Sequence, residues 1–77
     1  MKTDIIYSNE TLFVNFNGSI DKKELTKLKN KINYITNEYP ISDIVFDTKN
    51  LLLNSNNEIN NFINNYKYEF SGEIIIK

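Results

Sequence analysis

Apolar and polar residues alternate with a period of two near the start of the chain. Residues 3–7 and 11–17 therefore predict two β-strands. The second strand repeats its apolar side chains at every other position: Leu12, Val14 and Phe16. Residues 8–10, Ser-Asn-Glu, carry turn-forming side chains, so the two strands are expected to form a hairpin. Gly18 and Ser19 end the second strand.

The next segment changes to apolar spacings of three and four, which predicts a helix over residues 21–38. Its stripe comprises Leu25, Leu28, Ile32, Ile35 and Tyr39. Asp21 followed by Glu24 forms a capping box, in which each side chain accepts a bond from an unpaired backbone N–H of the other. Pro40 closes the helix, because the residue before a proline is pushed out of the helical region.

A second helix is predicted to start near Ser55, where Ser55 and Glu58 form another capping box. Its apolar stripe comprises Ile59, Phe62, Ile63 and Tyr66. Ser71 and Gly72 end the connection that follows this helix. Each helix is thus indicated by a capping box at its N-terminus and by an apolar stripe along one face.

Two further strands are predicted over residues 42–48 and 73–77. The first has three consecutive apolar residues, Ile44, Val45 and Phe46, as expected for a strand covered on both faces. Asp47 is expected at the carboxyl end of this strand, and residues 51–53 extend the apolar character through a short irregular stretch. The carboxyl end of a strand is where α/β folds place ligand contacts, but a solvated or capping aspartate is the simpler interpretation.

The element order ββαβαβ predicts one α/β domain over residues 1–77, with a mixed four-stranded sheet and two helices. The strand–helix–strand units imply parallel pairing with right-handed crossovers, and the hairpin adds an antiparallel strand. The sequence leaves open whether both helices lie on one face of the sheet. If they do, Phe13 and Val45 would be exposed on the other face and would indicate an interface.

The amino-acid composition excludes several kinds of catalytic and metal-binding site. The 77 residues carry a net charge of −1 and contain no Cys, His or Arg. These absences exclude a disulfide framework, thiolate or imidazole metal sites, a Cys nucleophile and an arginine fork for phosphate. Two glycines do not make a phosphate-binding loop. We therefore expect a non-catalytic interaction domain without a metal or cofactor.

The composition also bears on source and location. Asn occurs 14 times and Ile 12 times, a bias typical of A/T-rich genes. With the small size, this indicates a bacterial or mobile-element protein. The chain has no targeting segment and no long apolar run, which with the absence of Cys favours a cytoplasmic protein that does not enter a membrane.

Lysines are concentrated on the first helix, on the side away from its apolar stripe: Lys22, Lys23, Lys27, Lys29 and Lys31. They form either a solvated helix face or a docking surface for an acidic partner or nucleic acid. Without Arg or a basic field around them, nucleic acid is disfavoured. Most aromatic residues fall on inward stripes and are expected in the core.

Three short segments resemble the motifs of STAS domains, the sulfate-transporter and anti-sigma-factor-antagonist domains. Residues 18–21, Gly-Ser-Ile-Asp, are similar to the family's Gly-x-hydrophobic-Asp element after a strand. Residues 44–47, Ile-Val-Phe-Asp, and the apolar stretch after them are similar to the strand that leads to the family's Asp-Ser-Ser-Gly turn. Residues 54–57 occupy the position of that turn. Asn54, Asn56 and Asn57 stand where the family has Asp, Ser and Gly, and Ser55 keeps the serine.

The resemblance implies a protein–protein switch. Ser55 would be the phosphoacceptor at the surface that meets a regulator such as an anti-sigma kinase, with Asp21, Asn54, Asn56 and Asn57 beside it. Phosphorylation would add nearly two negative charges there. A plain N-cap role for Ser55 remains the alternative.

Three functional hypotheses remain. The chain is a STAS-like regulator of a partner protein, or a small phage or mobile-element inhibitor that binds a host protein, or, least favoured by its residues, an enzyme. The sequence does not identify the partner or the oligomeric state.

Overall fold

The computed structural model describes residues 3–51 and 56–77, without the side chains of residues 56 and 57. Its elements are β1 (Thr3–Ser8), β2 (Thr11–Gly18), α1 (Lys22–Glu38), β3 (Asp43–Leu51), α2 (Asn56–Glu69) and β4 (Glu73–Ile76). The predicted order ββαβαβ and the mixed four-stranded sheet are confirmed. The main difference lies in β3, which continues through Leu51 where an irregular stretch was expected.

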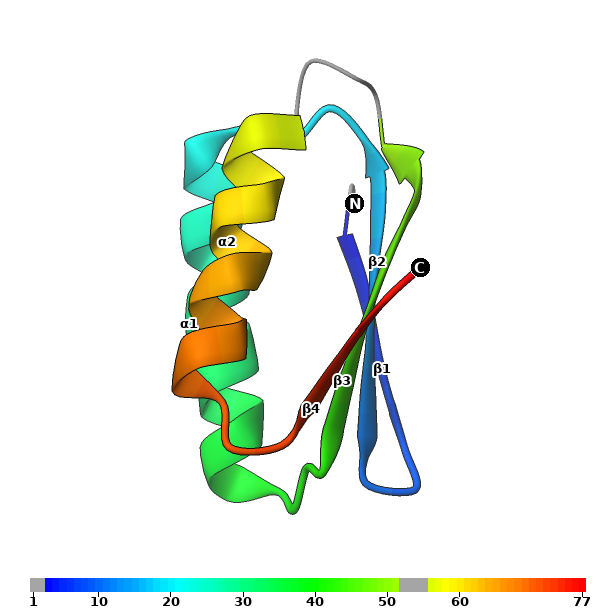
Figure 1. The fold of residues 1–77 in the computed structure, drawn as a ribbon, viewed down its shortest axis with the longest axis vertical. Helices are drawn as coiled ribbons and strands as arrows, with labels where there is room; N and C mark the ends of the chain where they lie inside the picture. Colours follow the sequence, from blue (N-terminus) through cyan, green and yellow to red (C-terminus); the bar gives the residue numbers. More distant parts are fainter. Residues whose placement is uncertain (1–2, 52–55) are drawn as a thin grey trace.

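The strands follow one another across the sheet in chain order, β1-β2-β3-β4. The β1–β2 pair is antiparallel, whereas β2–β3 and β3–β4 are parallel. Two right-handed crossovers that step in the same direction place their helices on the same side of a sheet. Both helices accordingly cover one face, and the opposite face carries none (Figure 1). The question that the sequence left open is thereby answered.

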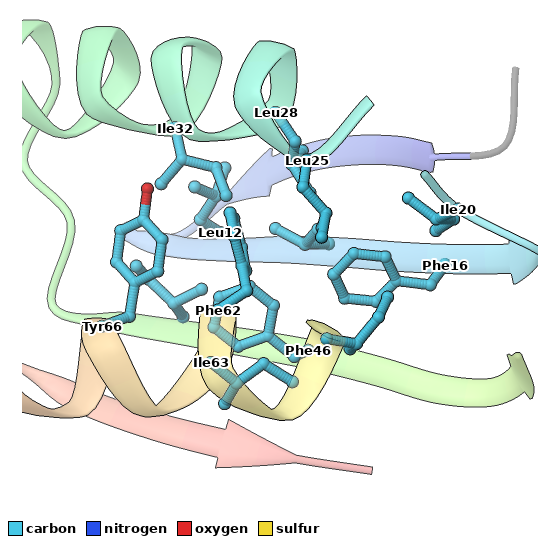
Figure 2. Packing of buried hydrophobic residues seen from close by; sticks show 13 residues of the cluster. Leu12, Phe16, Ile20, Leu25, Leu28, Ile32, Phe46, Phe62, Ile63 and Tyr66 are labelled. Atoms are coloured by element: carbon cyan, nitrogen blue, oxygen red, sulfur yellow. The ribbon is translucent and has the colours of Figure 1, made fainter. Parts of the chain in front are cut away.

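A single cluster of buried apolar side chains fills the space between this face and the helices (Figure 2). The sheet contributes alternate residues of β2 and β3: Leu12, Val14, Phe16, Ile44 and Phe46. The helices contribute the predicted stripes: Leu25, Leu28 and Ile32 from α1, and Ile59, Phe62, Ile63 and Tyr66 from α2. The Phe46 ring packs edge-on against Phe62, with ring centroids 6.2 Å apart. Tyr39 is the exception to the α1 stripe, because it caps the helix and is 51% exposed.

The ends of α1 follow from the local sequence. Asp21 is the N-cap, and its Oδ1 accepts a 2.9 Å hydrogen bond from the backbone N–H of Glu24. At the other end, the N–H of Tyr39 donates to the carbonyl of Ile35 before Pro40 stops the helix. The Tyr39 ring packs on Tyr7 of β1 at 5.7 Å, and the Tyr7 hydroxyl donates to the Pro40 carbonyl. The end of α1 is thus attached to the edge of the sheet.

The hairpin turn organises the starts of three strands. Asn9 and Glu10 have φ angles of 50° and 62°, so the two-residue connection is left-handed at both positions, as in a type I′ turn. The Glu10 carbonyl accepts from the backbone N–H of Ser42 at 2.8 Å, and the Ser42 carbonyl accepts from the N–H of Glu73 at 3.1 Å. A Cβ on Gly72 would overlap the Ser42 carbonyl, so this close approach requires glycine.

Ile32→Ala should lower the free energy of unfolding by roughly 2–4 kcal/mol, because Ile32 is fully buried and its truncation leaves a cavity. Urea denaturation measures the change. Tyr34→Ala, two residues along the same helix at a side chain that is 63% exposed, is the matched control and should cost much less. Equal losses in the two variants would contradict the assignment of Ile32 to the core.

Glu10→Gly should raise the free energy of unfolding by about 0.5–1 kcal/mol, because glycine adopts the left-handed conformation of this turn position without strain. Asn9→Gly should gain less, since asparagine tolerates the same region. Thermal melts of both variants provide the comparison. A lower melting temperature for Glu10→Gly would show that the Glu10 side chain contributes more than its backbone strain costs.

Candidate binding face

The helix-free face of the sheet carries one continuous apolar row. The strand registers pair Ile6 with Phe13, Phe13 with Val45, and Val45 with Ile75. These four residues, here called the open-face row, therefore lie side by side across all four strands. Each alternates with a neighbour that packs into or against the core, which directs the row to the face without helices.

Burial within the row differs from residue to residue. Ile6 is 55% exposed, Phe13 and Ile75 are half-buried, and Val45 is only 6% exposed. Val45 nevertheless does not belong to the core cluster. Val45 lies on the face without helices, so the cover on both faces suggested by the three consecutive apolar residues of β3 is not observed. The exposure predicted for Val45 on such a face is also wrong, because its cross-strand neighbours Phe13 and Ile75 are larger than valine and leave it little surface. The row thus forms an apolar surface with Val45 at its base.

Polar rows border the open-face row on both sides. On one side the registers align Asp4, Asn15 and Asp47, and on the other they align Ser8, Thr11, Asp43 and Glu73. Lys77 continues the alternation of β4 beyond Ile75, and its N–H donates to the carbonyl of Phe46. Among the described residues of these aligned rows, four carboxylates stand against one lysine, so the rows are acidic.

Asp47 lies in the middle of β3, and not at its carboxyl end as predicted. Its Oδ1 accepts a 3.1 Å hydrogen bond from the N–H of Lys49, where β3 bulges between the pairs Asn15–Asp47 and Asn17–Asn50. The parallel strands step across the sheet in one direction, so no point of reversed order opens a ligand crevice beside Asp47. The capping interpretation of Asp47 therefore fits the geometry better than a ligand contact.

The switch residues implied by the STAS resemblance have different outcomes. Ser55 and Asn54 lie outside the described residues, and so does the predicted capping box at Ser55. Asn56 and Asn57 form the first turn of α2, and Asp21 is the N-cap of α1. The parallel arrangement of β2 and β3 brings the starts of both helices to the same end of the molecule (Figure 1). The phosphorylation of Ser55 stays a prediction.

The lysines of α1 lie on the opposite side of the molecule from the open-face row. Lys22, Lys23, Lys27, Lys29 and Lys31 are all exposed, as their spacing predicted. The two broad surfaces of the molecule therefore differ in sign: the outer side of α1 is basic and the helix-free sheet face is acidic.

A small pocket lies between α1 and α2. It has a volume of about 170 Å³ and is lined by Asn33, Thr36, Tyr66, Glu69 and Phe70. Pockets that hold small molecules measure about 300–1,000 Å³, so this one is too small for a typical cofactor. Within the described residues, no group of three or more acidic residues is placed to hold a metal ion. No helix in the same part of the chain is long and apolar enough to cross a membrane.

Tyr66 at this pocket joins the two helices. Its hydroxyl points from α2 toward α1 (Figure 2), where it donates to the Asn33 Oδ1 at 3.1 Å. Burial, with a smaller contribution from the nearby Glu69 carboxylate, raises the pKa of Tyr66 from 10.0 to about 12. The hydroxyl therefore remains a donor at neutral pH, and its role here is structural.

Comparison with known proteins adds no relative: neither the protein-family models nor the curated protein sequences give a match to this chain. The STAS resemblance accordingly stays a prediction that rests on the motifs described above.

Sequence reasoning named two members of the open-face row, Phe13 and Val45, and missed Ile6 and Ile75. Of the carboxylates beside them it singled out Asp47, as a possible ligand contact, and missed Asp4, Asp43 and Glu73. The missing information was the strand order, because only the registers show that Ile6 and Ile75 are in line with Phe13. The period-two alternation of each strand carries part of the signal, but it does not indicate which face remains uncovered.

Tyr66→Phe should lower the free energy of unfolding by about 1 kcal/mol at neutral pH, because the hydrogen bond to Asn33 is lost. The folded-state pKa lies above the ordinary value, so the unfolded chain releases this proton first. The stability that Tyr66 contributes is complete below pH 10.0 and declines as the pH rises toward about 12. Urea midpoints of both proteins across this range should therefore converge. A constant difference up to the highest pH would contradict the raised pKa.

Proposed function

We propose that this protein is a non-catalytic interaction domain that binds a partner protein through the helix-free face of its sheet. The observation that carries the proposal is the open-face row: four apolar residues aligned across every strand, on a face that neither of the described helices covers. Apolar rows rimmed by polar residues are typical of interaction sites, since burial against a partner removes them from water.

The position of Phe13 supports this proposal. It is an aromatic residue near the centre of the face, and aromatic side chains contribute most to binding when they lie at the centre of an interface. It is also only half-buried in the isolated chain. Its cross-strand neighbour Ile6, which is 55% exposed, widens the apolar contact that a partner would meet.

The proposal accommodates both classes of interaction protein predicted from the sequence. A STAS-like regulator and a small inhibitor from a phage or mobile element would each act by binding another protein, without catalysis or a cofactor. A cytoplasmic location, expected from the absence of Cys, forms part of the same proposal. The identity of the bound protein separates the two classes, because a sigma regulator favours the first and a host defence nuclease favours the second.

The double variant Ile6→Thr/Phe13→Thr should weaken binding of a host protein at least about tenfold, because two exposed parts of the open-face row lose their apolar surface. Threonine suits a strand, so the fold should be retained. The measurement is affinity capture from host lysate, followed by titration of the captured protein. Thermal melts of each variant come first.

The matched control is Ile76→Thr/Tyr68→Thr, which also removes one isoleucine and one aromatic residue. Ile76 is 47% exposed on the helix side of β4, and Tyr68 is 90% exposed on α2. The control should bind the captured protein like the wild type. Equal binding by both double variants, with both folded, would show that the open-face row is not the interface.

A further inference from the structure

The charges beside the open-face row specify what kind of protein surface it fits, an inference that rests on the proposed function. Asp4 and Asp47 lie along one side of the row, and Asp43 and Glu73 lie along the other. A ligand that fills the row must place groups next to both pairs of carboxylates. Cationic groups on both flanks of an apolar centre would be attracted, and anionic groups would be repelled.

The dimensions of the strip fit a helix. The row crosses four strands, which at about 4.8 Å between strands gives a length of about 14 Å. The flanking rows lie two residues away on each side, so they are separated by about 13 Å across the strip. A helix is about 10–12 Å wide and rises about 1.5 Å per residue, so roughly nine or ten helical residues would span the row.

A helix also supplies the right pattern of side chains. Its apolar residues at spacings of three and four form one stripe, with polar residues on both flanks of the stripe. An extended strand would turn its alternate side chains away from the sheet, out of reach of the carboxylates. We propose that the helix-free face binds a basic amphipathic helix of a partner protein, with its apolar stripe on the open-face row and its lysines or arginines against Asp4, Asp47, Asp43 and Glu73.

The same charges disfavour the other occupants. A second copy of this chain, packed face to face, would bring two sets of four carboxylates together. A nucleic acid or an anionic membrane would be repelled by the same groups. The lysine-bearing side of α1 from another copy is disfavoured too, because that side carries the lysines and lacks the apolar stripe that the row would contact.

Two synthetic helical peptides test the proposal directly. Both have leucines at spacings of three and four; one has lysine at the polar positions and the other has glutamate. The lysine peptide should bind the full chain, and the glutamate peptide should not, as measured by fluorescence anisotropy at low salt. Binding should weaken as salt increases. Failure of the lysine peptide to bind would overturn the proposal.

A variant in which the four carboxylates beside the open-face row are neutralised distinguishes attraction of the peptide to this face from attraction to the net charge of the protein. Asp4→Asn, Asp43→Asn, Asp47→Asn and Glu73→Gln together change the net charge from −1 to +3, and Asn at position 47 keeps the oxygen that accepts from Lys49. The control, Glu10→Gln with Glu38→Gln, Glu58→Gln and Glu69→Gln, makes the same change of four charges elsewhere. The face variant should lose about tenfold in affinity for the lysine peptide, and the control much less. Equal losses would show that the affinity depends only on the net charge of the protein, and would overturn the proposal.

The results distinguish this inference from the proposed function. A captured host protein could lose affinity for the Ile6→Thr/Phe13→Thr variant but bind the neutralised variant unchanged. The helix-free face would then still be the interface, and the inference of a basic helix would be wrong. If the host protein is indifferent to Ile6 and Phe13, both fail. Sedimentation equilibrium tests the remaining outcome. If the wild type is a dimer and the Ile6→Thr/Phe13→Thr variant is a monomer, the occupant of the face is a second copy of this chain and not a basic helix.

Discussion

The handedness of two crossovers determines the organisation of this molecule. Each parallel strand pair requires a right-handed connection, and both connections step across the sheet in the same direction, from β2 to β3 to β4. Both helices must therefore lie on one face. A chain of 77 residues has no further helix among its described residues to cover the other face. The uncovered face is thus a consequence of the topology. The side chains on it make it apolar along the open-face row and acidic beside it.

The sequence predicted the local structure well because each element carries its own signals. Asp21 and Pro40 bound α1, and the stripes of both helices are the residues that enter the core. The errors occurred where tertiary context decides. Tyr39 continues the helical spacing but caps the helix and packs on Tyr7. The continuation of β3 to Leu51 depends on its pairing with β2 around the bulge, and no local pattern encodes that pairing.

The binding face was harder to predict for the same reason. Val45 has the sequence environment of a strand residue covered on both faces and is indeed buried, yet it lies on the face without helices and outside the core cluster. The residues of this row come from four separate strands, so the surface exists only after the sheet has formed. Prediction of the motif around Ser55 depended instead on local resemblance, and the geometry of the rest of the chain neither requires it nor opposes it.

The hydrogen bonds that leave the hairpin turn bear on the order in which the chain assembles. The hairpin closes over two residues, so its closure costs little entropy and we expect it to form before the parallel pairs. Once formed, it presents the Glu10 carbonyl as an acceptor for Ser42, whose own carbonyl then accepts from Glu73. Each new strand thereby finds its alignment from the strand that precedes it in the chain. The sheet can grow in one direction from a local nucleus, and the slow search for distant strand partners is reduced to two successive docking steps.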